Sequence, residues 1–206
     1  MTDDVAALRR ELEELRAECR ALGARAQGAE DYQAVCNLQA GYGYYIDKGR
    51  FDEAADLFAE DGTLELAGRG VFVGRERVRA YLNHLPPYGH GTLYNHMQLQ
   101  PVIHVDSVAG TAKGRWRSFM MVGGLGREAR WGEATYENEY VRTAEGWRIA
   151  LLHGYMNIYV EYDEGWHKGG VQLLRSIEGL EPDRPPTMQY EAYPEPVVAP
   201  YHYDRP

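Results

Sequence analysis

The sequence has little cysteine, no long apolar run and no excess of basic residues. Its 206 residues include only Cys19 and Cys36, and 22 Lys and Arg stand against 31 Asp and Glu, for a formal net charge of −9. Nucleic acids and acidic membrane surfaces attract clustered basic side chains, so this charge argues against both as partners. Because we find no secretory signal and no apolar run of about 18 residues, we expect a reduced, soluble, cytoplasmic protein.

Several motifs that mark cofactor or nucleophile chemistry are also missing. The chain contains no Gly-x-Ser-x-Gly, no phosphate-binding loop and no His-Glu-x-x-His. Residues 123–128, "GGLGRE", lack the strand and helix that flank a dinucleotide-binding loop. Cysteine and histidine are not spaced as in zinc sites, and the acidic residues show no metal-ligand spacing. We therefore expect neither a metal nor a cofactor.

Tyrosine is the residue type present in excess, with 16 tyrosines against four phenylalanines. Tyrosine suits places where an aromatic surface also needs a polar group. Three of the tyrosines precede Asp47 in the stretch "YGYYIDKGR", residues 42–50. We interpret this stretch as the rim of a small-molecule pocket.

Helix patterns come first in the chain and strand patterns follow. We expect helices at residues 3–26, 31–46, 51–58 and 75–85, and two short strands in "GTLELAG" and "GVFVG". Four long strands are expected in "HMQLQPVIHVDS", "GTAKGRWRSFMMVG", "ARWGEATYENEYVRT" and "EGWRIALLHGYMNIYV". This order predicts an α+β fold, a cone-shaped barrel in which a curved antiparallel sheet surrounds three helices.

Three regions are predicted along the chain: an N-terminal helix (1–28), a central catalytic domain (29–163) and a C-terminal extension (164–206). The glycines of "GARAQGAED" are expected to end or kink the first helix. A coiled-coil seam is predicted in this helix at Leu8, Leu12, Leu15, Cys19 and Leu22. We expect the seam to pack on its own domain or on a second subunit. The Pro- and Tyr-rich extension is expected to be a lid, a strap across a neighbouring subunit, or disordered.

Three segments carry a resemblance to a known family: "FDEAADLFAEDGTLEL…GVFVGRERVRAYL", "HMQLQPVIHVDSVAGTAKGRW" and "YENEYVRTAEGWRIALLHGYMNIY". Residues from about 30 to 162 resemble the SnoaL-like branch of the nuclear transport factor 2-like superfamily. The resemblance implies a cone with one open mouth, which is the natural ligand site, and a homodimer or homotrimer. Enzymes and binding proteins share this fold, so the fold alone does not fix the function.

Within that superfamily the chain resembles a group of cofactor-free elimination enzymes. The group includes bile acid 7α-dehydratase, scytalone dehydratase, a lindane dehydrochlorinase and a diarylpropane formaldehyde lyase. Its early-helix Tyr and Asp are matched by Tyr42 and Asp47, and its His-Met-x-x-x-Pro strand by residues 96–101. Its Gly-Tyr-x-Arg-Ile-Tyr strand is matched by residues 154–159, where Asn157 stands in place of Arg.

The resemblance implies a role for each matched residue. His96 is expected to act as the general base, because an imidazole titrates near neutral pH and a carboxylate such as Asp47 can orient it. Tyr42 or Tyr45 is expected to polarise or protonate the departing oxygen. On an ideal helix Tyr42 lies about 140 degrees from Asp47, so we expect the last helical turn to unwind. The expected substrate-binding residues are Tyr44, Tyr136, His153, Tyr155 and Asn157.

These expectations lead to three alternative functions. The first is a lyase that eliminates water or formaldehyde from a hydroxylated aromatic, lignin-like substrate. The second is a steroid-type double-bond isomerase, which would use Asp47 and a tyrosine without His96. The third is a binding module without catalysis, in which Asp47 and His96 would lie too far apart for a hydrogen bond, or side chains would fill the pocket.

Overall fold

The computed structural model describes residues 2–205 as three helices, six strands and a short 3-10 turn. The helices are α1 (Thr2–Asp47), α2 (Phe51–Asp56) and α3 (Arg75–Leu82). The strands are β1 (Phe58–Leu66), β2 (Val71–Val73), β3 (Thr92–Asp106), β4 (Thr111–Gly124), β5 (Ala129–Thr143) and β6 (Gly146–Glu161). The turn η1 (Trp166–Lys168) follows β6.

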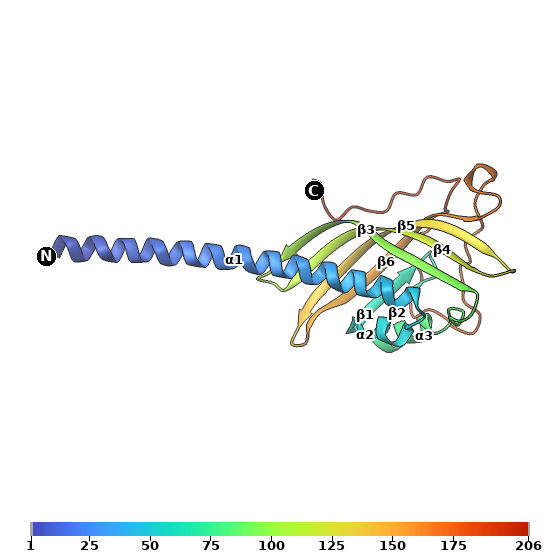
Figure 1. The fold of residues 1–206 in the computed structure, drawn as a ribbon, viewed down its shortest axis with the longest axis horizontal. Coiled ribbons are helices and arrows are strands. Elements are labelled where there is room, and N and C mark those ends of the chain that lie inside the picture. The colour runs from blue at the N-terminus through green and yellow to red at the C-terminus, as the bar shows by residue number, and fades with distance from the viewer. Residues whose placement is uncertain (1, 206) are drawn as a thin grey trace.

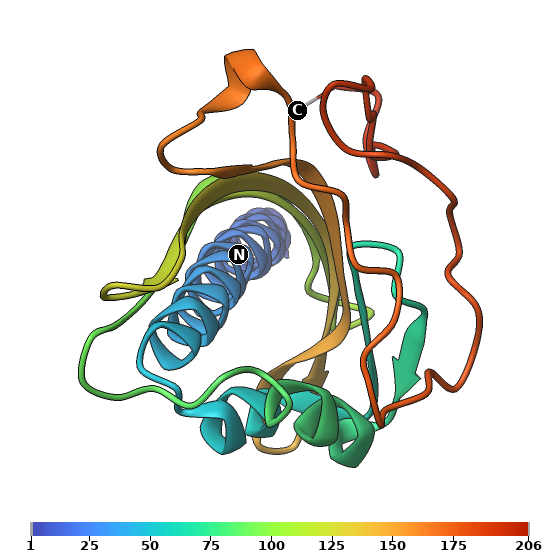
Figure 2. The same ribbon diagram turned by 90° about the vertical axis from the view of Figure 1, so that its right-hand side faces the viewer.

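The six strands form one curved sheet in the order β2-β1-β6-β5-β4-β3. All neighbours run antiparallel except β1 and β6, which are parallel. The sheet does not close, and it wraps around the C-terminal half of α1, while α2 and α3 lie across the open side (Figures 1 and 2). The predicted α+β fold, with a curved sheet around three helices, is confirmed.

Helix α1 is continuous, which corrects the expected division into two helices. Its 46 residues run through Gly23 and Gly28 without a break. A glycine costs a helix only about 1 kcal/mol relative to alanine, and the flanking segments here are rich in alanine, a strong helix former. Asp31, where the second helix was expected to begin, is buried in mid-helix, where it pairs with Arg142 and accepts a hydrogen bond from Trp147 Nε1.

Helix α2 is shorter than expected because the chain turns into β1 at Phe58. The helix was expected to continue to residue 58, but it ends at Asp56, and the residues "EDG" (60–62) lie inside the strand. The pairing of β1 with β6 shifts register between Phe58 and Thr63, so a bulge absorbs these polar residues. Helix α3 likewise ends at Leu82 rather than at residue 85.

The C-terminal segment after β6 forms an irregular strap (Figures 1 and 2). Residues 171–174 line the cavity described below, and most of the remaining strap follows the outside of the sheet. The amide of Val171 donates to Tyr159 O, and Arg184 bridges to Val71 on β2. Thr187 then bonds Glu65, and His202 bonds Glu137 near the end of the chain. The predicted domain boundaries stay a prediction, but residues 164–205 lie against the sheet of their own chain.

Candidate functional site

A cavity of about 450 Å³ lies between α1 and the concave face of the sheet. This volume is in the usual range for sites that take small organic molecules. Its wall combines aliphatic side chains with five phenols, those of Tyr42, Tyr81, Tyr94, Tyr136 and Tyr159. The charged lining residues are Arg69, Arg127, Glu128 and Arg130, and the one imidazole in the wall belongs to His96.

His96 lies in β3 and faces this cavity as a neutral ring. The strand begins at Thr92, so the expectation that His96 opens it is wrong. Among residues 2–205 its buried Nδ1 has no hydrogen-bond partner. Burial disfavours the charged form and lowers the pKa of His96 from 6.5 to about 4. The ring is therefore uncharged at neutral pH, and its Nδ1 makes no hydrogen bond within the described residues.

Asp47, the last residue of α1, holds the backbone of His96 and not its ring. Its Oδ1 accepts the His96 N–H at 2.5 Å and lies 4.0 Å from His96 Nδ1. The second distance is too long for a hydrogen bond. The carboxylate is nevertheless close enough to stabilise an imidazolium by charge.

A buried amide network fixes the same strand to α1 two turns earlier. Gln39 is fully buried and donates to Gln98 Oε1 at 2.9 Å, while Gln98 donates to His96 O at 3.0 Å. The side-chain oxygen of Gln39 accepts hydrogen bonds from Asn138 Nδ2 and from the Tyr140 hydroxyl, both on β5. Residues of α1 thus hold both the N–H and the C=O of His96. Asp47 accepts from the N–H directly, and Gln39 reaches the C=O through Gln98.

The phenols of Tyr42 and Tyr136 lie together at the inner wall of the cavity. Both side chains are almost completely buried. Burial raises the pKa of Tyr42 well above its usual value, and burial likewise raises the pKa of Tyr136. Tyr81 lies close to both, and its oxygen accepts a hydrogen bond from Arg69 Nη1 at 2.8 Å. The phenols of Tyr42 and Tyr136 stay protonated and can donate hydrogen bonds to a substrate oxygen.

The three tyrosines before Asp47 have different surroundings. Tyr42 lines the cavity as expected, but the helix continues to Asp47 without unwinding. No unwinding is needed, because the curved sheet surrounds α1 and meets more than one face of the helix (Figure 2). Tyr44 is 72% exposed, and the ring of Tyr45 lies beneath the Arg50 guanidinium. Neither is among the lining residues, so the structure does not support their expected roles.

A bulge in β6 changes which side chains of this strand point into the cavity, compared with the prediction. Ala134 pairs with Met156 and Glu133 with Ile158, so Asn157 is an extra residue in β6. Before the bulge, Gly154 and Met156 face the cavity; after it, Tyr159 does. His153, Tyr155 and Asn157 are therefore not among the lining residues, contrary to expectation, whereas Tyr136 on β5 is, and its role in substrate binding stays a prediction.

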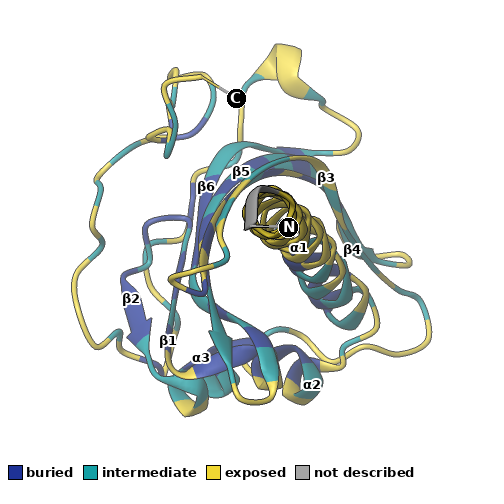
Figure 3. Cartoon of the chain, turned by 90° about the vertical axis from the view of Figure 1, so that its left-hand side faces the viewer, coloured by how far each residue is buried: buried dark blue, intermediate teal, exposed yellow. Residues whose placement is uncertain are grey.

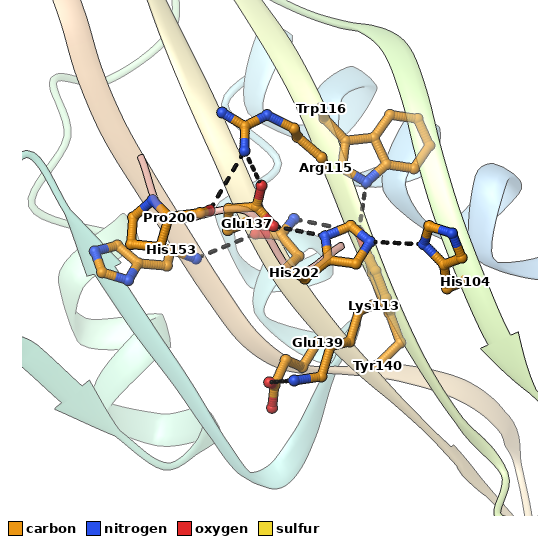
Figure 4. Close-up of polar contacts among 11 residues, drawn as sticks. His104, Lys113, Arg115, Trp116, Glu137, Glu139, Tyr140, His153, Pro200 and His202 are labelled. Atoms are coloured by element: carbon orange, nitrogen blue, oxygen red, sulfur yellow. Dashed lines mark hydrogen bonds and ion pairs between the residues drawn. The ribbon is translucent and has the colours of Figure 1, made fainter. Parts of the chain in front are cut away.

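These three residues lie on the outer face, under the C-terminal strap. His153 Nε2 is 3.5 Å from the buried carboxylate of Glu65, and its ring stacks on Tyr155 with centroids 4.0 Å apart. The amide of Asn157 donates to Glu133 and Thr135. Figure 4 shows the neighbouring outer-face contacts, in which His202 of the strap joins Glu137 and His104.

Some lining residues were missed by the sequence analysis. Tyr94 lies two residues before His96, so strand alternation could have identified it. Residues 171–174 of the strap also line the cavity, and Leu173 belongs to a small apolar cluster against which Met156 and Tyr159 pack. The strap residues follow no helix or strand period, so no pattern in the sequence pointed to them.

Comparison with known proteins identifies related sequences and folds. A family model described as a SnoaL-like domain matches residues 27–153. The uncharacterized protein Rv2910c of Mycobacterium tuberculosis is 25% identical over 120 residues, which cover 58% of this chain and 80% of that protein. None of the helices within the described residues is long and apolar enough to cross a membrane.

Solved structures share the fold at low sequence identity. A candidate scytalone dehydratase from Novosphingobium aromaticivorans superposes with a TM-score of 0.61 at 18% identity, covering 76% of this chain and 99% of its own. An NTF2-like protein of the same organism gives 0.54 at 23%, covering 66% and 87%. A protein from Catenulispora acidiphila solved in complex with S-DNPA gives 0.53 at 24%, covering 62% and 94%. At these identities the likenesses show a shared fold.

Proposed function

The chain belongs to the SnoaL-like domain family, and on that premise we propose that it is a cofactor-free lyase acting on a hydroxylated aromatic molecule. The observation that supports this most is the neutral imidazole of His96 in the cavity wall, with its Nδ1 unbonded in the described residues and the Asp47 carboxylate 4.0 Å away. A neutral ring next to a carboxylate is the arrangement that a general base needs, since the carboxylate stabilises the imidazolium that forms.

In the proposed dehydration, His96 takes a proton from the carbon beside the one that bears the hydroxyl group. The electron pair of that C–H bond forms the new double bond as the C–O bond breaks. A phenol of Tyr42 or Tyr136 donates a hydrogen bond, and then the proton, to the leaving oxygen, which departs as water. The imidazolium returns its proton to the tyrosine through solvent once the product leaves.

In the proposed release of formaldehyde, His96 takes the proton of a hydroxymethyl group instead. The acceptor is a quinone methide, which forms beforehand when a para-hydroxybenzylic alcohol loses water. The C–C bond breaks, formaldehyde departs, and the electron pair converts the quinone methide into a phenolate, which then takes the proton from His96. Both reactions use the same parts, a base on β3 and hydrogen-bond donors on α1 and β5.

The lining supports an aromatic substrate with hydroxyl groups. Aromatic rings and aliphatic side chains such as Met120 and Met156 can pack against a planar ring system, while the phenols offer donors for its oxygens. Arg69 and Arg130 each have a partner at hand, Tyr81 and Glu161 respectively, so they are not dedicated to a substrate anion.

The experiment is incubation of the protein with a panel of hydroxylated diaryl compounds and polyketide-like alcohols, followed by mass spectrometry. Loss of water, of formaldehyde, or of both from a panel member is the expected result. His96→Gln and Asp47→Asn should reduce the rate, Tyr42→Phe should reduce it less, and the exposed control Tyr44→Phe should leave it unchanged. Full turnover by both His96→Gln and Asp47→Asn would overturn the proposal.

One observation favours a second candidate, a binding module. The 4.0 Å between Asp47 Oδ1 and His96 Nδ1 is longer than a hydrogen bond, as a non-catalytic site would allow. Catalytic hydrogen bonds often tighten only with substrate bound, and the open cavity suits either role. Tight binding of a panel member without any mass change would favour binding. The isomerase alternative gains no support, because Asp47 is not among the lining residues.

A further inference from the structure

The N-terminal half of α1 projects away from the rest of the molecule. Residues 4–27 are all exposed, and they extend beyond the sheet as a single rod (Figures 1 and 3). Large apolar side chains on this rod are about half exposed or more: Val5 49%, Leu8 64%, Leu12 47%, Leu15 52% and Leu22 59%. A lone helix of this length is marginally stable in water, so a partner that covers the leucines would stabilise it.

These side chains occupy the seam positions of three consecutive heptads. Val5, Leu12 and Cys19 fall at the first position of each heptad, and Leu8, Leu15 and Leu22 at the fourth. The seam runs unbroken over residues 5–25 because α1 continues through Gly23. Leucine at the fourth position, with a β-branched residue at a first position, favours two parallel strands over three or four.

The charges beside the seam select the orientation of the partner. Glu11 and Glu18 occupy the seventh heptad position, and Arg9 and Arg16 the fifth. In a parallel pair the seventh position meets the fifth position of the next heptad on the other strand, so Glu11 would face Arg16 of the second copy. In an antiparallel pair like positions meet, which would set Glu against Glu and Arg against Arg.

The rest of the chain does not cover this seam. The face of α1 that is buried in the domain is formed by Asp31, Val35, Gln39, Tyr42 and Ile46. At 100 degrees per residue, the mean direction of this face lies about 170 degrees from that of the seam. Two helices joined along the seam would therefore carry their domains on opposite outer sides, without collision.

We propose that residues 5–25 form a parallel, two-stranded coiled coil with a second copy of this chain. The surface is independent of the cavity and of the function proposed for it. In this arrangement Cys19 lies at a first heptad position and faces Cys19 of the second copy across the seam.

Cross-linking of the full-length protein tests both the pairing and its direction. In a Cys36→Ser background, mild oxidation should link two chains through Cys19 into a reducible dimer. The matched control carries Cys19→Ser and Ala17→Cys, which moves the thiol to the outward-facing side of the helix, and it should not link. Equal linking of both variants, or linking of the control alone, would overturn the proposal, as would no linking of Cys19.

Charge reversal provides the second arm, read by light scattering as mass relative to the 23.4 kDa chain. The unmodified protein should have twice that mass. Glu11→Arg and Arg16→Glu should each weaken self-association roughly tenfold, because each sets like charges against each other, and an equimolar mixture of the two should restore it. Circular dichroism controls for loss of fold. A monomer at all concentrations, a trimer, or no restoration in the mixture would overturn the proposal.

Discussion

At the scale of single residues, the proposed catalysis depends on the protonation state of His96. Its folded pKa of about 4 means that the free enzyme keeps a neutral base well below pH 6.5. We expect kcat/KM for the substrate found in the panel to hold from pH 7 to about pH 5 and to fall only near pH 4. A fall in kcat/KM centred near pH 6.5 would show that the ring is solvated, or paired with Asp47, in the free protein.

The same shift predicts how acid affects stability. The unfolded chain binds a proton at His96 near pH 6.5 and the folded chain only near pH 4, so the unfolded state binds more protons in between. Acidification from pH 7 to pH 5 should therefore cost the native protein about 2 kcal/mol through this residue. Urea unfolding of His96→Gln, which cannot titrate, should lose that much less between the two pH values. Equal losses in both proteins would contradict the burial of the ring.

At the scale of elements, the site depends on how closely α1 approaches β3. A Cβ at Gly43 would lie 2.8 Å from Gln98 Cγ and 3.1 Å from His96 O. Alanine would gain about 1 kcal/mol of helix propensity but would push the helix away from the strand. We expect Gly43→Ala to lower turnover clearly while changing the free energy of unfolding little. Gly23→Ala, where nothing lies within 4 Å, should stabilise the protein and leave turnover unchanged.

The elements also show how far the sequence could predict this structure. Periodicity was enough for the four long strands, and the resemblance was enough to bring Tyr42, Asp47 and His96 together. The outer position of Tyr155 and Asn157 could not be predicted, because one extra residue in β6 inverts the alternation and leaves no compositional mark. The continuity of α1 through Gly23 was missed because a breaker residue was weighed without its alanine-rich surroundings.

At the scale of the whole molecule, the C-terminal strap is fastened to the outer face by buried carboxylates. Glu65 is 1% exposed and accepts hydrogen bonds from both the amide and the hydroxyl of Thr187. Glu65→Ala leaves these donors and His153 without their partner, so we expect a loss of about 3 kcal/mol in the free energy of unfolding. Denaturant titration measures it.

The matched control for that prediction is Glu139→Ala. Glu139 pairs with Lys113 at 3.0 Å, but both side chains are about half exposed. An ion pair of this kind contributes only about 0.5 kcal/mol. Similar losses for the two variants would mean that the Glu65 contact does not fasten the strap.

The central claim, that His96 is the base of a cofactor-free elimination, has one direct test. The measurement is kcat/KM of the unmodified protein and of His96→Gln on the panel member that loses water or formaldehyde. If His96 is the base, kcat/KM of the variant should be lower by about 100-fold to 10,000-fold, the usual contribution of a positioned general base. Equal values for the two proteins would contradict it.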